Sequence, residues 1–220
     1  MTEQTVEMGQ ADMPARAEAG VNDADIKRRL IRAIATGIIA HADELTVLDA
    51  AIGDGDHGHN MKRGFEAVLS DVETLSAAPW PDLLKGAGTR LVMKVGGASG
   101  PLYGTFFMAM GKDFPVPASR EGMANALRAA LAALKARGKS EVGQKTMIDV
   151  LAPAIEAFAE GRDLASVREA AAQAAKATIP VRATRGRASF LGDRSIGHMD
   201  PGARSSSLIV EIICNELGAI

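Results

Sequence analysis

Apolar residues recur three and four positions apart in one segment of this chain after another, and this spacing constrains the fold more than any other feature. The first such segment carries Ile26, Leu30, Ile34 and Ile38 on one helix face. We find no segment with the apolar–polar alternation of a half-buried strand. Aromatic residues make up only 4% of the chain, and a core poor in rings and rich in alanine suits closely packed helices. We therefore predict an all-α fold, a bundle of about eight helices.

Capping residues and breakers place the helix boundaries. Asn22 or Asp23, Ser119 and Asp163 can each cap a helix that follows, and proline or glycine ends most of the periodic runs. The predicted helices span about 23–48, 58–75, 81–94, 104–112, 120–137, 146–159, 164–177 and 203–217.

Charge and composition exclude several classes of protein. A formal net charge of -2 argues against a nucleic-acid partner, and no apolar run reaches the roughly 18 residues of a membrane span. Cys214 is the only cysteine, so no internal disulfide can form, and we expect a cytoplasmic protein. Residues 1–21 are polar, aperiodic and without the apolar core of a secretory signal. We expect them to be a disordered tail before one helical domain at 22–220.

Three carboxylates, Asp49, Asp54 and Asp56, lie within one glycine-rich stretch between the first two predicted helices. They repel one another unless a cation neutralises them, and the glycines allow the backbone to bring them together. Carboxylate oxygens suit Mg²⁺, which usually completes its octahedral shell with phosphate oxygens. The spacing excludes an EF-hand, because Gly58 and Phe65 fall where calcium ligands would be required. The alternative is a solvated turn rich in Asp and Gly.

Two other irregular stretches, 95–104 and 181–202, carry groups that bind anions. The first contains Gly-Gly-Ala-Ser-Gly at 96–100, whose backbone N–H groups can face an anion if a helix begins there; the alternative is a tight turn between helices. The second contains four arginines, Arg182, Arg185, Arg187 and Arg194, which either grip phosphates or form a solvated loop. A metal loop, a glycine loop and a basic loop together suit phosphoryl transfer, which needs no covalent protein nucleophile.

Four sequence blocks, DAAIGDGDHGHNM, VGGASGPLYGTFF, VGQKTMIDVLAPA and GRASFLGDRSIGHMDPGA, closely resemble those of the dihydroxyacetone kinase L subunit family. The resemblance extends over about residues 24–218. It implies an eight-helix antiparallel up-and-down barrel with the nucleotide site at one end. It also implies that Asp49, Asp54 and Asp56 hold two magnesium ions, which bridge to the phosphates of ADP or ATP. The residues that match the family's nucleotide contacts are His57, Gly58, His59, Asn60, Ala98, Ser99, Gly138, Met147, Arg187, Asp200, Pro201 and Gly202.

The resemblance further implies a kinase subunit that is incomplete alone. Its nucleotide would pass a phosphoryl group to dihydroxyacetone held on a separate K subunit, and an M subunit of the phosphotransferase system would recharge the bound ADP in some bacteria. Three alternatives remain open: an ATP-dependent erythrulose kinase subunit, a nucleotide-sensing regulatory module and, less compatible with DGDHGHNM, a fatty-acid kinase domain. The donor, the ketose and the oligomeric state, including a homodimer, also remain open.

Overall fold

The computed structural model describes residues 22–219, and within that range every regular element is a helix. The prediction of an all-α fold is confirmed, while the expected tail at 1–21 lies outside the described residues. The helices are α1 Asp23–Ala40, α2 Ala42–Ile52, α3 His57–Ser70, α4 Val72–Ala77, α5 Trp80–Lys94, α6 Ser99–Lys112, α7 Arg120–Gly138, α8 Ile148–Ala159, α9 Leu164–Ala177, the 3₁₀ helix η1 Arg187–Ser195 and α10 Pro201–Gly218.

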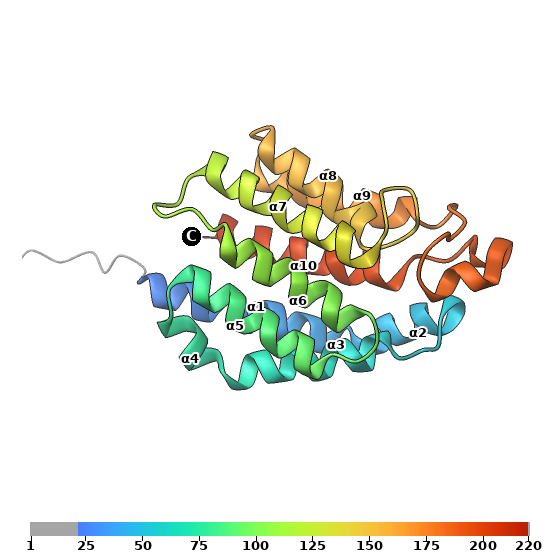
Figure 1. The fold of residues 1–220 in the computed structure, drawn as a ribbon, viewed down its shortest axis with the longest axis horizontal. Coiled ribbons are helices and arrows are strands. Elements are labelled where there is room, and N and C mark those ends of the chain that lie inside the picture. The colour runs from blue at the N-terminus through green and yellow to red at the C-terminus, as the bar shows by residue number, and fades with distance from the viewer. Residues whose placement is uncertain (1–21, 220) are drawn as a thin grey trace, which may run out of the picture.

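The helices form a closed ring. Going round the molecule, α1 packs on α3, then α5, α6, α7, α8, α9 and α10 follow in order, and α10 packs back on α1. Neighbours in the ring run in alternating directions along the long axis of the molecule (Figure 1). This is the predicted antiparallel up-and-down barrel, with α2 and α4 as continuations of α1 and α3.

Two of the eight predicted helices are each broken in two, which the apolar spacing did not reveal. The first break is at His41, whose backbone leaves helical geometry and whose ring Nδ1 lies 2.7 Å from Gly37 O. The second is at Asp71, which accepts a hydrogen bond from Arg90 Nε on α5. Apolar periodicity continues through both breaks because residues on either side, Ile38 and Leu45 at the first and Val68 and Val72 at the second, belong to the same core cluster.

The sixth helix of the structure begins at Ser99, not at residue 104 as predicted. Gly100 and Gly104 lie inside it at a close crossing with α5, and a Cβ at Gly104 would fall 2.7 Å from Gly88 O. These glycines therefore serve close helix packing as well as a turn. Similarly, α10 begins at Pro201 and not at 203, and η1 lies within the stretch 181–202 that was predicted to be irregular.

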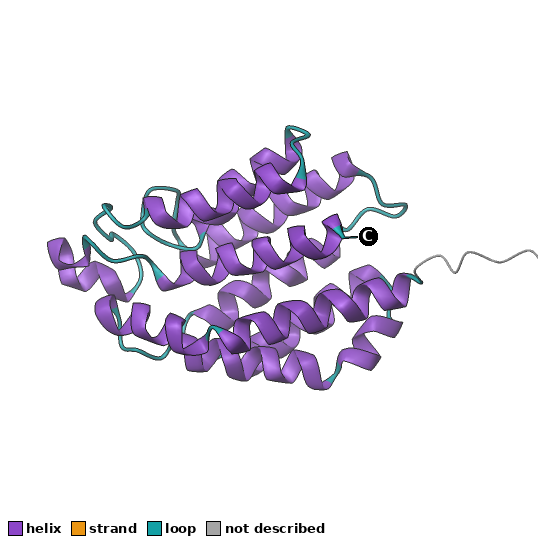
Figure 2. Cartoon of the chain, turned by 180° about the vertical axis from the view of Figure 1, so that it is seen from behind, coloured by secondary structure: helices purple, strands orange, loops and turns teal. Residues whose placement is uncertain are grey.

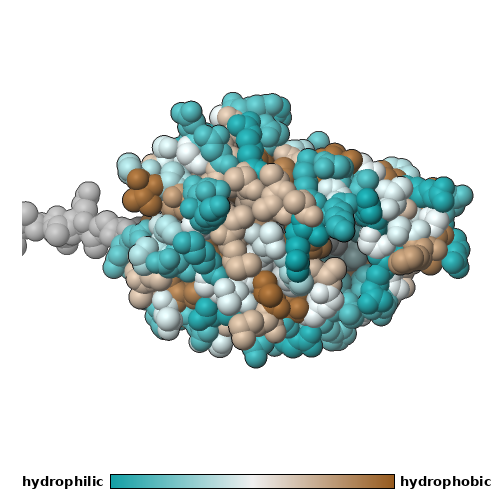
Figure 3. All heavy atoms as spheres, in the orientation of Figure 1, coloured by the Kyte–Doolittle hydropathy of each residue, from teal (hydrophilic) through white to brown (hydrophobic). Residues whose placement is uncertain are grey.

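The core fills the interior of the ring. Its main cluster joins α1, α3, α5, α6, α7 and α8 through residues such as Ile38, Leu91 and Leu134. A second, alanine-rich cluster lets α8, α9 and α10 approach closely, with Ala171 and Ala203 fully buried. No described helix is long and apolar enough to cross a membrane. Hydrophilic and apolar residues are interspersed over the face seen in Figure 3.

Alternating helix direction brings every second connection to the same end of the barrel. Residues 53–56, 95–98, 139–147 and 178–200 join helices at the end where α2 and η1 lie, the right-hand end in Figure 1 and the left-hand end in Figure 2. The three stretches that the sequence marks as chemically active therefore meet, although they are far apart along the chain.

Candidate nucleotide and metal site

The three aspartates converge at this end of the barrel. Asp49 lies in the last turn of α2, and Asp54 and Asp56 follow in the turn that leads into α3. One carboxylate oxygen from each lies within 4.8 Å of the others. Asp49 is buried, Asp56 is partly buried and Asp54 is exposed, so the cluster opens from the core toward solvent. Three convergent hard oxygen donors fit a magnesium ion.

Backbone hydrogen bonds hold Asp49 in place. Its Oδ2 accepts from the N–H groups of Asp56 at 2.8 Å and His57 at 3.1 Å, which leaves Oδ1 available to a ligand. A Cβ at residue 53 would fall 2.2 Å from that Oδ1, so glycine is required there. Gly55 adopts φ +74 and reverses the chain. The glycines expected to allow convergence are thus confirmed in that role at these two positions.

A helix N-terminus faces the aspartates. α6 begins after Ala98, and within residues 22–219 no side chain caps it, so its first N–H groups can face an anion. Gly97 has φ +63, and a Cβ there would lie 3.9 Å from both carboxylate oxygens of Asp56. The glycine loop and the acidic loop therefore adjoin, an arrangement that can hold a cation and a phosphate side by side.

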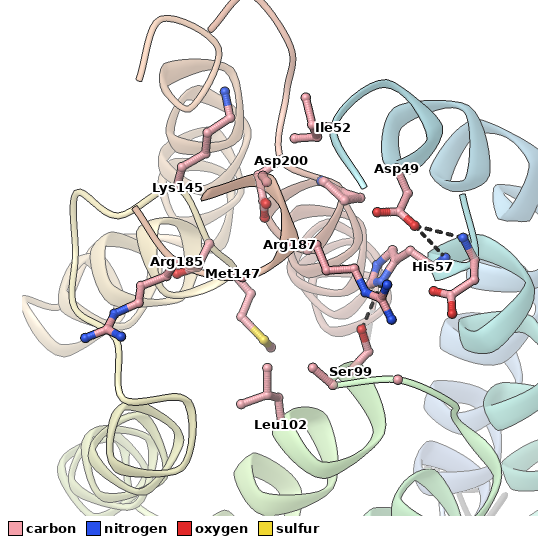
Figure 4. Close-up of a pocket in the computed structure, with 18 of the residues that line it drawn as sticks. Asp49, Ile52, His57, Ser99, Leu102, Lys145, Met147, Arg185, Arg187 and Asp200 are labelled. Carbon is pink, nitrogen blue, oxygen red and sulfur yellow. Dashed lines mark hydrogen bonds between the residues drawn. The ribbon is translucent and has the colours of Figure 1, made fainter. Parts of the chain in front are cut away.

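The basic segment contributes one arginine directly. Arg187 Nη1 lies 2.9 Å from Asp54 Oδ2, and its side chain extends toward the acidic cluster, whereas Arg185 points away from it (Figure 4). Arg182 pairs with Asp193 within the same segment. Of the four arginines, Arg187 is the one that this structure brings to the carboxylates.

A buried polar network lies beneath the aspartates. His57 Nδ1 is 3.0 Å from Ser99 Oγ and Nε2 is 2.9 Å from Ser205 Oγ, and Tyr103 Oη is 2.7 Å from Ser205 Oγ and 2.8 Å from Ser206 Oγ. Burial lowers the pKa of His57, against the charges of Asp49 and Asp56, so the ring is held neutral. Burial also raises the pKa of Tyr103 to about 12. The network is uncharged and ties α3, α6 and α10 together under the site.

The opposite wall of the pocket is formed by the start of α10 and the loop before α8. Asp200 caps α10 by accepting from Ala203 N at 2.7 Å. Burial raises the pKa of Asp200 to about 7, and the carboxylates of Asp149 and Asp49 add to the rise. Met147 and Leu102 point toward each other across the pocket (Figure 4). They supply an apolar surface of the kind that holds a flat base.

Most of the predicted site residues line this one pocket. These are Asp49, Asp54, Asp56, His57, Ala98, Ser99, Met147, Arg187, Asp200, Pro201 and Gly202.

Four predicted contacts lie outside the lining. Gly58 packs on α2, where a Cβ would fall 1.9 Å from Ala42 O. His59 is exposed, with Nδ1 3.3 Å from Thr46 Oγ1. Asn60 accepts from Arg63 Nη2 at 2.7 Å beside the glycine loop. Gly138 ends α7, and a Cβ there would lie 3.3 Å from Leu102 Cδ2. A nucleotide role for these four stays a prediction.

Several lining residues carried no sequence signal. Leu102 and Tyr103 lie in the stretch 95–104 that was predicted to be irregular, and nothing in that stretch singled them out. The start of α6 at Ser99 and the hydrogen bond from Tyr103 to Ser205 of α10 place them at the pocket. Lys145 is fully buried at 1% exposure, which no local pattern predicts for a lysine.

Comparisons with known proteins show which family the sequence matches. The sequence profile described as the DAK2 domain matches residues 51–215, a range that includes Asp54 and Asp56 and begins just after Asp49. The chain is 48% identical over 166 residues to a Listeria innocua protein, the ADP-binding subunit of a PEP-dependent dihydroxyacetone kinase, covering 75% of this chain and 82% of that one. It is 38% identical over 182 residues to the corresponding Escherichia coli subunit, covering 78% and 87%.

A solved structure shares the fold. The dihydroxyacetone kinase of C. freundii, crystallised with AMP-PNP and Mg²⁺, superposes with a TM-score of 0.71 at 26% identity. The match covers 97% of this chain and 38% of that longer one.

Proposed function

The chain belongs to the DAK2 domain family, and from that premise we propose that it is the ADP-binding subunit of a dihydroxyacetone-type kinase. In this role its bound nucleotide passes a phosphoryl group to dihydroxyacetone or a related ketose held on a separate K subunit. Residues 22–219 form the nucleotide-binding unit.

The observation that carries the proposal is the meeting of opposite charges at one pocket. Three carboxylates with oxygens within 4.8 Å lie beside the free N-terminus of α6 and beside Arg187. Asp49, Asp54 and Asp56 would hold magnesium, for which two ions are proposed. When bound, magnesium neutralises phosphate charge and lowers the cost of its transfer.

The chain's own groups bind and orient the nucleotide. Backbone N–H groups at Ala98 and Ser99 would donate to the phosphate oxygens of a bound nucleotide, and Arg187, which lies beside Asp54, would donate to them as well. Met147 and Leu102 bound the space for the base. The neutral ring of His57 fixes Ser99 at the head of α6 and adds no positive charge. Positioning and electrostatics therefore suffice, and no side chain needs to become phosphorylated.

Two of the relatives belong to PEP-dependent kinases, which favours phosphoenolpyruvate as the ultimate phosphoryl donor for this chain as well. We propose that an M subunit of the phosphotransferase system recharges the ADP while it stays bound. Exchangeable ATP is the alternative, because the chain is also 31% identical to an L-erythrulose 1-kinase of Mycolicibacterium smegmatis, of which it spans 37%.

Native mass spectrometry of the protein as purified tests both the function and the donor. A mass increment of ADP with two magnesium ions is expected if the coenzyme is tightly held. A bare mass, with binding only after ATP is added, would instead support an ATP-dependent kinase. No binding of ADP or ATP at any magnesium concentration would contradict the proposed function. The same spectrum reports whether the chain is a homodimer.

A further inference from the structure

Lys145 is a buried cation at the edge of the nucleotide pocket, and its side chain is directed away from Asp49 and His57 (Figure 4). The residue is 1% exposed. Its backbone has φ +62, an unusual left-handed conformation for lysine. Asp149 holds the surrounding loop by accepting hydrogen bonds from Gly143 N at 2.5 Å and Thr146 N at 2.6 Å. The loop is thus built to aim this ammonium in one direction.

The ammonium ends in a cage of main-chain oxygens. Nζ lies 2.9 Å from Thr178 O, 3.4 Å from Ile179 O, 3.0 Å from Val181 O, 2.7 Å from Ser195 O and 2.6 Å from His198 O. Within residues 22–219 it forms no ion pair with a carboxylate. An ammonium has three donors, so five oxygens surround it more in the manner of a bound monovalent cation than of a salt bridge.

The cage belongs to a segment that cannot organise itself. Thr178 and Ile179 follow the C-terminus of α9, where the helix dipole favours a cation. The rest of the segment up to Asp200 has no regular structure apart from η1. Ser195 Oγ braces it by accepting from Ala183 N at 2.9 Å and donating to Gly192 O at 2.7 Å. Without a cation at the centre, buried carbonyl dipoles would face one another unpaired, so the segment would open.

We infer that Lys145 is a positioning residue for the nucleotide site: its ammonium acts as a tethered cation that shapes residues 178–200 and so places Arg187 and the start of α10. The segment it gathers runs directly from the end of α9 to Asp200, which caps α10. Arg187 lies within it and contacts Asp54 across the pocket. The effect of Lys145 on the nucleotide rests on the proposed function, whereas its effect on the segment does not.

Chemical rescue of Lys145→Gly tests this inference. Glycine accepts the left-handed backbone and leaves a channel that n-butylammonium, the missing part of the side chain, can fill. We expect the Kd for ADP with Mg²⁺ to rise about tenfold and the tryptic cleavage at Arg185 and Arg187 to accelerate, both by loosening of the segment. Millimolar n-butylammonium should reverse both changes, and tetramethylammonium, which has the same charge but no N–H donor, should reverse neither. The wild type should respond to neither salt.

The outcomes separate the inference from the proposed function. An ADP affinity and a cleavage rate equal to those of the wild type would overturn the inference, and so would equal rescue by both salts. If the wild type binds no nucleotide but the variant still shows accelerated cleavage that n-butylammonium suppresses, the proposed function fails and the effect of Lys145 on residues 178–200 stands. Should Lys145→Gly not fold, Ser195→Ala decides, because it loosens the cage outside the pocket lining. Faster tryptic cleavage is then expected, and an unchanged rate overturns the inference.

Discussion

The two ends of the barrel each bury a lysine, and they stabilise it in opposite ways. At the end away from the pocket, Lys27 of α1 forms an ion pair with Asp23, donates to Ala78 O at 2.9 Å and lies 5.4 Å from the ring centroid of Trp80. Lys145, at the pocket end, has carbonyl oxygens as its partners. The first lysine is neutralised where it stands, whereas the second organises a segment that carries ligand-binding groups.

The same contrast holds for the acidic residues. Asp23 accepts from Trp80 Nε1 at 2.9 Å, and its hydrogen bond with Lys27 lowers its pKa. Asp49, Asp54 and Asp56 instead crowd three like charges into one place, with Arg187 as the ion-pair partner of one of them. Asp23 and Lys27 are paired within the fold. The three aspartates carry more negative charge than Arg187 can neutralise, which favours a bound cation. Sites for ligands commonly carry such uncompensated charge at a cost in stability.

Removing the acidic charge should have the largest effect. Asp54→Asn combined with Asp56→Asn should weaken ADP binding in Mg²⁺ by about 100-fold or more, because amides replace the charged oxygens that hold the metal. The same variant should be more stable than the wild type without ligand, since repulsion is relieved. Calorimetric titration and thermal unfolding measure the two effects. Asp113→Asn, on an exposed aspartate after α6, should change neither quantity. Magnesium-dependent ADP binding by the double variant would show that these carboxylates do not hold the metal.

The pH dependence of stability should differ between two capping aspartates. Burial raises the pKa of Asp200 to about 7 from an ordinary value of 3.8, so its stabilising contribution is fully present below 3.8 and lost as the pH rises through about 7. We expect Asp200→Asn to remove this pH-dependent loss of unfolding free energy, which is on the order of 2 kcal/mol because solvent screens the partly exposed side chain. Denaturant unfolding of the protein without ligand across this range measures it.

The control for Asp200 lies at the other end. Hydrogen bonds from Ser166 lower the pKa of Asp163, the cap of α9, so its contribution is present above 3.8 and lost as the pH falls further. Asp163→Asn should therefore lower the unfolding free energy relative to the wild type, and only at pH values above about 3.8, whereas Asp200→Asn should raise it. Parallel pH profiles for the two variants would contradict the distinction.

Replacing each buried lysine by methionine should separate a role in ligand binding from a role in stability. Lys145→Met should weaken ADP binding by about tenfold through the loosened segment 178–200. Lys27→Met should leave ADP affinity unchanged and lower the free energy of unfolding by about 1 kcal/mol, since it removes an ion pair and a ring contact. Titration and denaturant unfolding of both variants measure these effects. A Lys27→Met variant with impaired ADP binding would show that the two ends are coupled.

The smallest expected effect comes from adding one methyl group at Gly53. Gly53→Ala should weaken magnesium-dependent ADP binding by about fivefold, because the new Cβ falls 2.2 Å from Asp49 Oδ1 and must displace that carboxylate. Gly218→Ala is the matched control, because among the described residues no atom lies within 4 Å of a Cβ at this position near the end of α10. Equal Kd values for Gly53→Ala and the wild type would mean that Asp49 is not held as tightly as its backbone hydrogen bonds indicate.

Two glycines and one lysine have structural roles that the local sequence did not predict. Gly58 and Gly104 stand in or beside motifs with the composition of binding loops, yet both face close helix crossings. A glycine that approaches a ligand and a glycine that approaches another helix leave the same mark in one sequence. The burial of Lys145 could not be predicted from its neighbours in sequence, because the carbonyls around its ammonium lie 33 to 53 positions further along the chain.

The sequence alone determined what local physics controls. Apolar spacing set the all-α class, caps at Asn22, Ser119 and Asp163 set helix starts that the structure confirms, and the Asp–Gly pattern marked the acidic loop. Which distant groups meet depends on how the helices pack: closure of the ring brings Arg187 to Asp54 and directs Lys145 into its cage of carbonyl oxygens. Hydrogen-bonded turns and helix periodicity act within a few residues, whereas burial and charge pairing depend on which helices become neighbours.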